Sequence, residues 1–299
     1  MNVSAVSAIR RFFAQEDVNF LLCNRIPRRL ATLCMGWYSG LANPWVVRAS
    51  LRAWQAFGDL DLSDARKRDF RTLQECFTRE LVPGARPVDP DPAHLCSPSD
   101  AIVGACGTIA EGIVLQAKGF PYRIDELFGP SQDTRPLRDG VYATLRLTSG
   151  MYHRFHAPHD CTVEHATYLS GDTWNVNPVA LARVERLFCR NERAVLRLRL
   201  SDGGWPVALV PVAAILVAGI RLSFVDVRLH LRYRGPNELP CDARLSKGEE
   251  MGCFQHGSTI LVFAPRGFAL CAGIEPGRRI RMGEPLMRLP VPAAGSGAG

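Results

Sequence analysis

The sequence predicts an α+β fold in which a helical N-terminal region precedes a mostly β body. Apolar residues recur at helical spacing in the first part of the chain, and short alternating runs replace them from about residue 95. Twenty-one prolines and 26 glycines are spread over the 299 residues and indicate many turns. With 47% apolar and 22% charged residues, the composition is that of a globular protein. We therefore expect a helical region over residues 1–80 and a mostly β domain over residues 81–299.

The helical region is predicted from spacing and from helix-start signals. One helix face is formed by residues three or four positions apart: Val47, Leu51, Trp54 and Phe57. Ser63 and Asp64 form a plausible helix start before residues 65–76. The proline-rich stretch 83–92 interrupts this pattern and indicates a boundary.

The β body is predicted from alternating and buried runs. Residues 141–147 and 195–200 alternate in the manner of half-buried strands. Residues 205–220 are uncharged but contain two prolines, and they are too short to span a bilayer, which takes about 20 residues. Two buried strands joined by a turn explain them better. Residues 277–284 predict a hairpin with its turn at Met282-Gly283.

The whole chain carries a net charge of +7, and much of this positive charge lies near the N-terminus. Residues 1–58 hold seven arginines, two acidic residues and three of the five tryptophans. This combination is typical of a segment that lies on an anionic lipid surface, and a helical cap with solvated arginines explains it equally well. No nucleic-acid-binding motif accompanies the arginines. The ten cysteines form no CxxC pair, so we expect free thiols in a reducing compartment.

Three short segments carry residues suited to chemistry. One holds Asp100 after a proline turn, one holds His153 and His156, and one is the run Gly257-Ser258-Thr259 before an apolar strand. Each segment alone is also explained by an ordinary turn or by surface hydrogen bonding.

Together with their neighbours, these segments resemble the motifs of the phosphatidylserine decarboxylase family. The matching strings run in order from about residue 75 to 285 and are Cys76–Leu81 with Gly84–Pro87, Gln116–Tyr122, Tyr152–Pro158, Val176–Pro178, Asn191–Arg193 and Lys247–Thr259. The resemblance departs at His256, which precedes the Gly-Ser-Thr run, at Ala101, which follows the acid, and over residues 212–220.

The resemblance implies a proenzyme that converts phosphatidylserine to phosphatidylethanolamine and CO2. It implies that Asp100 orients His156, that His156 removes the proton from Ser258, and that the chain is cut between Gly257 and Ser258 by serinolysis. Ser258 would become a covalent pyruvoyl cofactor, an electron sink that forms a Schiff base with the substrate amine. His153 would act as the acid–base group of decarboxylation.

The resemblance also implies partners and a location. The fragments 1–257 and 258–299 would remain associated, and the substrate would be a phospholipid in the membrane surface. A peripheral position on the cytoplasmic face of a bacterial-type cell membrane follows, with residues 1–80 as the membrane-associating region. A homodimer stays open beside the monomer, and neither nucleic acid nor metal is expected.

Three alternatives stay open from the residues. A serine hydrolase would use Asp100, His156 and Ser258 in an uncut chain. A metal site would use the neighbouring histidines, although no cysteine or acid stands at zinc spacing from them: His153, His156, His159 and His165. An unprocessed, non-enzymatic relative would explain His256 and Ala101.

Overall fold

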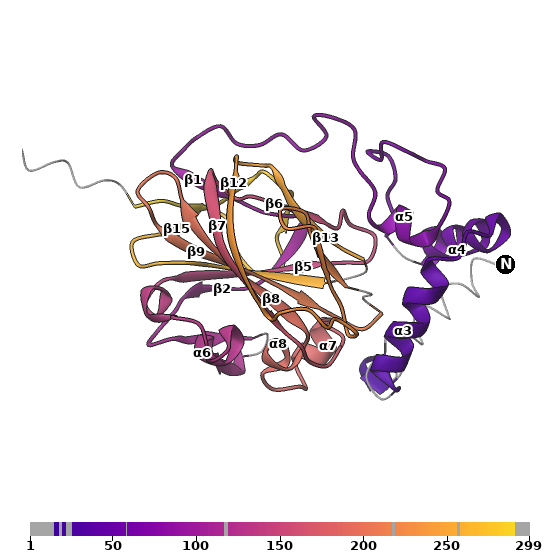
Figure 1. The fold of residues 1–299 in the computed structure, drawn as a ribbon, viewed down its shortest axis with the longest axis horizontal. Helices are drawn as coiled ribbons and strands as arrows, with labels where there is room; N and C mark the ends of the chain where they lie inside the picture. Colours follow the sequence, from indigo (N-terminus) through magenta and orange to yellow (C-terminus); the bar gives the residue numbers. More distant parts are fainter. Residues whose placement is uncertain are drawn as a thin grey trace, which may run out of the picture.

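The computed structural model describes residues 15–17, 20–21, 26–57, 59–116, 119–216, 219–255 and 258–290. Within them, a few helices near the N-terminus stand beside a body built mainly of antiparallel strands (Figure 1). The predicted α+β fold is therefore confirmed. The helices of the first region are α3 (Arg28–Ser39), α4 (Pro44–Phe57) and α5 (Leu73–Phe77). No helix among the described residues is long and apolar enough to cross a membrane.

Helix α4 has the apolar face that the sequence predicts. It starts at Pro44, whose fixed φ suits the first helical position, and the Asn43 side chain accepts hydrogen bonds from the next free backbone N–H groups. Val47 is buried, and Leu51 and Trp54 are half-buried on the side that faces the body. The side chain of Phe57 lies outside the described part of the molecule.

The predicted helix over residues 65–76 is wrong, because only its last turn is helical. Thr72 caps α5 by accepting a hydrogen bond from the Glu75 N–H, which sets the helix start. The residues before it pair with another segment instead: Ala65 forms a β-bridge with Leu81, and the Arg66 N–H donates to the Glu80 carbonyl. These tertiary hydrogen bonds outweigh the local helical preference.

The centre of the body is an eight-stranded sheet in which every neighbouring pair is antiparallel. Its order is β12 (Glu238–Leu245), β7 (Cys161–Leu169), β8 (Arg193–Leu200), β9 (Pro206–Ala213), β14 (Ser258–Ala264), β5 (Val141–Leu147), β2 (Ala101–Thr108) and β16 (Arg279–Ile280). All residues of β14 are buried, because this strand lies in the middle of the sheet and is covered on both faces.

Three smaller sheets and several short helices complete the body. A four-stranded sheet has the order β11 (Val227–Leu229), β10 (Ile220–Leu222), β13 (Glu250–Phe254), β6 (Arg154–His156). A three-stranded sheet joins β1 (His94–Cys96), β17 (Pro285–Arg288) and β15 (Ala269–Leu270), and β3 (Ile113–Leu115) pairs with β4 (Pro121–Arg123). The short helices are α6 (Ile124–Phe128), η2 (Arg135–Leu137), α7 (Pro178–Leu181) and α8 (Leu187–Arg190).

The two faces of the large sheet have different neighbours. Figure 1 shows α6, α7 and α8 below the sheet, whereas β6 and β13 lie away from these helices. Phe263 of β14 packs edge-on against Phe128 of α6, with ring centroids 5.3 Å apart. Since side chains alternate along a strand, odd-numbered residues of β14 face these helices and even-numbered residues face the other side.

The last two strand predictions differ in outcome. Residues 205–220 do form buried strands on either side of a turn, but β9 belongs to the large sheet and β10 to the four-stranded sheet. The predicted hairpin over 277–284 is wrong. A turn does occur at Gly283, yet β16 pairs with β2, while the following β17 pairs with β1 and β15. Each strand finds its hydrogen bonds in a different sheet, so this segment crosses between sheets.

Candidate active site

Ser258 is the first residue of the central strand β14. Its Cα partners are Leu147 on β5 and Ala213 on β9, and the residue is completely buried. Its Oγ has no hydrogen-bond partner within the described residues. A buried hydroxyl without a partner loses the free energy of the hydrogen bonds that it would make in water, so such a group calls for a functional explanation. Gly257 and His256 lie outside the described residues.

His156 ends β6 and is held by two hydrogen bonds. Its Nδ1 lies 2.9 Å from the Gly248 carbonyl oxygen, and its Nε2 lies 2.9 Å from the Tyr152 hydroxyl. A carbonyl can only accept, so Nδ1 carries the hydrogen, and in the neutral ring Nε2 is the basic nitrogen that accepts from Tyr152. Burial lowers the pKa of His156 from its ordinary value of 6.5, against the opposing effect of Gly248. The ring is thus neutral and basic near pH 7.

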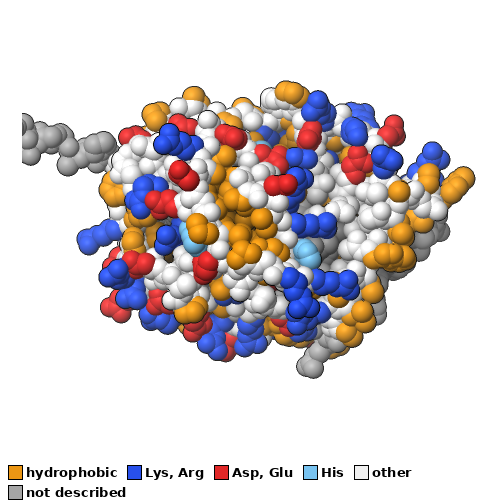
Figure 2. Space-filling view, viewed as in Figure 1, with side chains coloured by type: hydrophobic (Ala, Val, Ile, Leu, Met, Phe, Trp, Pro, Cys, Tyr) orange, Lys and Arg blue, Asp and Glu red, His pale blue; other side chains and the backbone are white. Residues whose placement is uncertain are grey.

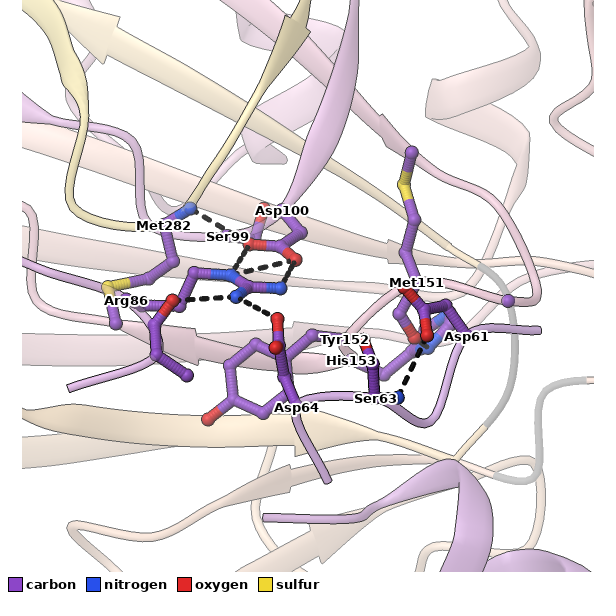
Figure 3. Close-up of polar contacts among 12 residues, drawn as sticks. Asp61, Ser63, Asp64, Arg86, Ser99, Asp100, Met151, Tyr152, His153 and Met282 are labelled. Atoms are coloured by element: carbon purple, nitrogen blue, oxygen red, sulfur yellow. Dashed lines mark hydrogen bonds and ion pairs between the residues drawn. The ribbon is translucent and has the colours of Figure 1, made fainter. Parts of the chain in front are cut away.

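Asp100 binds an arginine rather than a histidine. Its carboxylate accepts from Nε and Nη2 of Arg86 at 2.8 and 2.7 Å, and from the Met282 backbone N–H at 3.0 Å. Arg86 also bridges to Asp64 at 2.9 Å (Figure 3). These charge-assisted hydrogen bonds raise the pKa of Arg86, with Asp100 as the main cause.

The direct Asp100–His156 contact implied by the family resemblance is therefore absent from the described part of the structure. Both ring nitrogens of His156 are taken, by Gly248 and by Tyr152. Asp100 acts on the ring from a distance, and its negative charge favours the protonated form of His156. The groups that orient His156 by contact, Tyr152 and Gly248, stand inside the matched motifs, but spacing gave no sign of their role.

His153 occupies an aromatic and fully buried position. Its Nδ1 lies 2.8 Å from the Met151 carbonyl oxygen, which again places the hydrogen on Nδ1. The Phe77 ring packs against the imidazole with centroids 4.2 Å apart, and Trp54 of α4 stacks on Phe77 at 5.1 Å. Nη2 of Arg79 donates to the same Met151 carbonyl at 3.2 Å and to that of Gly150 at 2.8 Å. The Cys76–Leu81 string thus supports the loop that carries His153.

A mostly apolar cavity of about 590 Å3 is lined by Leu147, which is the Cα partner of Ser258 on β5. One wall is formed by α3, α4 and α5, and the other by the end of β5 with Leu147 and by Ala214, which follows Ala213, the partner of Ser258 on β9. Phe77 lines it too, so the ring that packs on His153 also forms part of the cavity wall. Asn177, which caps α7 through its side chain, contributes to the same lining. The cavity is large enough for part of an amphipathic ligand.

The remaining motif residues hold the fold together. The Gln116 side chain bonds the carbonyls of Leu181 and Val184 and the N–H of Leu187, which ties α7 to α8. The Asn191 side chain donates to the carbonyls of Trp174 and Ala213. These contacts give both side chains a structural role in joining segments that are distant in the sequence.

The histidines do not gather around a common point. Nε2 of His159 lies 2.8 Å from the Pro92 carbonyl, and His165 pairs with Glu238 at 2.6 Å. Over the ranges that the structure describes, no three or more His, Cys, Asp or Glu side chains are placed to share a metal ion.

Comparison with known proteins agrees with the geometry. The model of the phosphatidylserine decarboxylase family matches residues 73–288. The chain belongs to the phosphatidylserine decarboxylase family. A phosphatidylserine decarboxylase proenzyme of Xanthomonas axonopodis pv. citri is 33% identical over 284 residues, which cover 91% of this chain and 98% of that protein. The proenzyme of Myxococcus xanthus is 33% identical, covering 90% and 98%, and that of Brevibacillus brevis is 32% identical, covering 89% and 95%.

The motif strings shared with this decarboxylase family supply the residues described above. The motif strings of the family converge on one region: Gly84–Pro87 supplies Arg86, Cys76–Leu81 supplies Phe77 and Arg79, and Tyr152–Pro158 supplies both histidines. Segments far apart in the sequence thus contact one another: Phe77 packs on His153, and Arg86 binds Asp100.

Proposed function

We propose that this chain is a phosphatidylserine decarboxylase proenzyme that cuts itself before Ser258 and produces phosphatidylethanolamine and CO2. The observation that carries the proposal is the placement of Ser258. A fully buried hydroxyl, with no partner among the described residues, begins the central strand and adjoins an apolar cavity, inside the family's processing motif. A structural serine at such a position would be destabilising without a hydrogen bond.

In the processing step, Nε2 of His156 takes the Ser258 Oγ proton, either directly after the Tyr152 hydroxyl moves or through that hydroxyl. Ser258 Oγ then bonds to the Gly257 carbonyl carbon, and an ester replaces the amide as the bond to the Ser258 nitrogen breaks. Loss of the Ser258 Cα proton expels the Gly257 carboxylate, and water replaces the nitrogen, which leaves as ammonia. The neutral, basic state of His156 suits the first transfer.

Asp100 and Arg86 would act as positioning and electrostatic groups in that step. Asp100 stabilises positive charge on His156 as the ring accepts the proton. Arg86 fixes Asp100 and limits this effect by neutralising part of its charge. The role of Asp100 is therefore to tune the imidazole, with Tyr152 and Gly248 as the groups that orient it.

The site suits a pyruvoyl group at position 258. When present, this group supplies the carbonyl that accepts electrons as CO2 leaves. The apolar cavity beside residue 258 can receive the lipid and exclude water from its carboxylate, which favours loss of charge. His153, with hydrogen on Nδ1 and its ring held against Phe77, is the group for proton transfer to the substrate carbon.

The two fragments would stay together because of where the cut falls. Residues 258–299 contribute β14 to the large sheet, paired with β5 on one side and β9 on the other. They also contribute β17, which pairs with β1. Backbone hydrogen bonds on both edges of a buried strand would hold the short chain in place.

The helices α3 and α4 suit docking on the cytoplasmic face of a membrane. Trp37 is 70% exposed and Trp45 is 78% exposed, and Leu30 of α3 is also exposed. Figure 2 shows apolar side chains along the end of the molecule that these helices form in Figure 1. Exposed arginines occur on the same helices, namely Arg29, Arg48 and Arg52. Aromatic and basic groups together favour an anionic lipid surface, and this end adjoins the cavity.

Mass spectrometry of the purified protein tests the proposal. We expect a 42-residue fragment (258–299) with a blocked keto-acyl N-terminus, together with the 257-residue fragment, and CO2 release from phosphatidylserine. Ser258→Ala should give a single inactive chain. An intact 33.0 kDa chain that decarboxylates fully would contradict the processing step, and ester hydrolysis by an intact chain would support a serine hydrolase instead. Activity that survives chelation would separate this chemistry from a metal-dependent one.

A further inference from the structure

The cavity beside Ser258 has a single charged group in its described lining. Of the 17 residues that line it, Arg146 alone carries a charge, and the others are apolar or neutral polar. No acidic residue of this lining opposes it. A cation in a mostly apolar wall is costly unless an anion or several hydrogen-bond acceptors meet it.

Arg146 stands close to the reactive position. It precedes Leu147, the Cα partner of Ser258, and its own Cα partners are Thr259 on β14 and Ile102 on β2. Its side chain therefore starts from the opposite face of the sheet to Ser258, near the end of β5, where both Arg146 and Leu147 line the cavity. The arginine side chain is long and flexible enough to reach past the end of the strand.

The guanidinium has no ion pair or hydrogen bond with any described residue, although the residue is half-buried. The charged neighbour that acts on it is another cation, Arg279 on β16, and burial together with Arg279 lowers the pKa of Arg146. Three other arginines of this region have partners: Arg86 pairs with Asp64 and Asp100, Arg154 pairs with Glu250, and Arg79 donates to backbone carbonyls. Arg146 thus differs from arginines that stabilise the fold.

We propose that Arg146 is the phosphate-recognition residue, whose guanidinium binds the phosphodiester of the lipid substrate while the apolar cavity receives the glycerol and the start of the acyl chains. This inference rests on the proposed decarboxylase function and adds a specificity residue to it. A planar guanidinium matches two phosphate oxygens, and the pair is strongest in a site of low dielectric.

The substrate offers two anions, and the reaction decides between them. The carboxylate loses its charge as CO2 departs, so a cation bound to it would stabilise the ground state more than the transition state and slow the step. The phosphodiester keeps its charge throughout, and only a methylene and an oxygen separate it from the amino-bearing carbon. Binding there contributes equally to substrate and transition state, so its removal should raise KM more than it lowers kcat.

The test compares Arg146→Met and Arg146→Lys with wild type on two substrates. One is dihexanoyl-phosphatidylserine, and the other is O-octylserine, which keeps the amine and carboxylate but lacks the phosphate. We expect Arg146→Met to lose roughly 10- to 100-fold in kcat/KM on the phospholipid, mostly through KM, and little on the phosphate-free substrate. Arg146→Lys should fall between, since it keeps the charge but not the bidentate geometry.

The matched control is Arg197→Met, because Arg197 is a half-buried arginine of the same sheet, on β8, and is not among the cavity-lining residues. It should leave both substrates unchanged. A binding arm uses the uncut Ser258→Ala precursor, alone and with Arg146→Met, titrated calorimetrically with dihexanoyl-phosphatidylserine. The double variant should bind about 10- to 100-fold more weakly than Ser258→Ala.

Two outcomes would overturn the assignment: equal losses on both substrates, or unchanged binding in the calorimetric arm. If Arg146→Met is still cut into fragments of normal size, the decarboxylase proposal remains valid even though the role of Arg146 is disproved. If wild type stays uncut and inactive, the decarboxylase proposal fails instead, and the calorimetric arm alone decides whether Arg146 binds the phosphodiester.

Discussion

The two histidines of the site stand three residues apart and have opposite surroundings. His156 lies in a polar region, bonded to Tyr152 and Gly248 and influenced by the Asp100–Arg86 pair. His153 lies in an aromatic region, where Phe77 separates it from Trp54 and forms part of the cavity wall. The difference suggests a division of labour, in which the polar side serves self-cleavage and the aromatic side serves the lipid.

The largest effects should come from replacing each histidine in turn, because each variant should lose a different one of the two reactions. His156→Asn removes the proposed base, so self-cleavage should slow by about a thousandfold and leave an uncut chain on a denaturing gel. His153→Asn should still be cut but should lose decarboxylation. Equal processing defects in the two variants would contradict the division of labour, and circular dichroism of both would exclude unfolding as the cause.

The next largest effect should come from Arg86→Met. This change leaves Asp64 and Asp100 facing each other without the cation between them, so we expect a loss of about 1–3 kcal/mol in the free energy of unfolding and slower self-cleavage. Chemical denaturation and a processing time course measure the two effects.

Asp100→Asn in the same background is the control for charge. It replaces one of the two carboxylates that Arg86→Met leaves unpaired by a neutral amide. The double variant Arg86→Met with Asp100→Asn should therefore be more stable than Arg86→Met alone. Strictly additive losses would mean that the pair does not interact energetically. Its processing rate would then report on Asp100 separately from stability.

The pH dependence of the self-cleavage rate should show whether His156 acts as a buried base. Its pKa lies below the ordinary 6.5, chiefly because burial disfavours the charged ring. More than half of the rings are therefore neutral at pH 6.5, and the midpoint of the pH–rate profile should lie below 6.5. The rate of self-cleavage can be measured by refolding denatured precursor and then changing the pH rapidly in a stopped-flow instrument. A midpoint above 6.5 would contradict the assignment.

The smallest effect should come from the surface of α3 and α4. Trp37→Ser with Trp45→Ser should weaken binding to vesicles of phosphatidylglycerol and phosphatidylethanolamine several-fold, because two exposed indoles lose their place at the lipid boundary. Activity on soluble dihexanoyl-phosphatidylserine should not change. The control is Leu115→Ser on β3, an exposed apolar residue outside these helices. An equal loss of vesicle binding in the control would contradict a docking role for Trp37 and Trp45.

Much of the fold could be predicted because period and turn residues are local properties. The helix face of Val47, Leu51 and Trp54 follows from side-chain spacing, and the buried strands around residues 205–220 follow from an uncharged run that contains two prolines. The helix over 65–76 and the hairpin over 277–284 failed for one reason. Their backbone groups bond to distant segments, Glu80 and β2, which no local pattern reveals.

The sequence by itself determined the α+β class, the family motifs and the candidate residues Asp100, His153, His156 and Ser258. Only the tertiary structure decided which of them meet: Asp100 pairs with Arg86, Tyr152 and Gly248 hold His156, and Arg146 lines the cavity beside Ser258. The physical reason is that motifs record residue types and spacing, whereas hydrogen bonds and burial depend on which distant strands pair. Ser258 is buried because β14 lies between β5 and β9 in the middle of the large sheet.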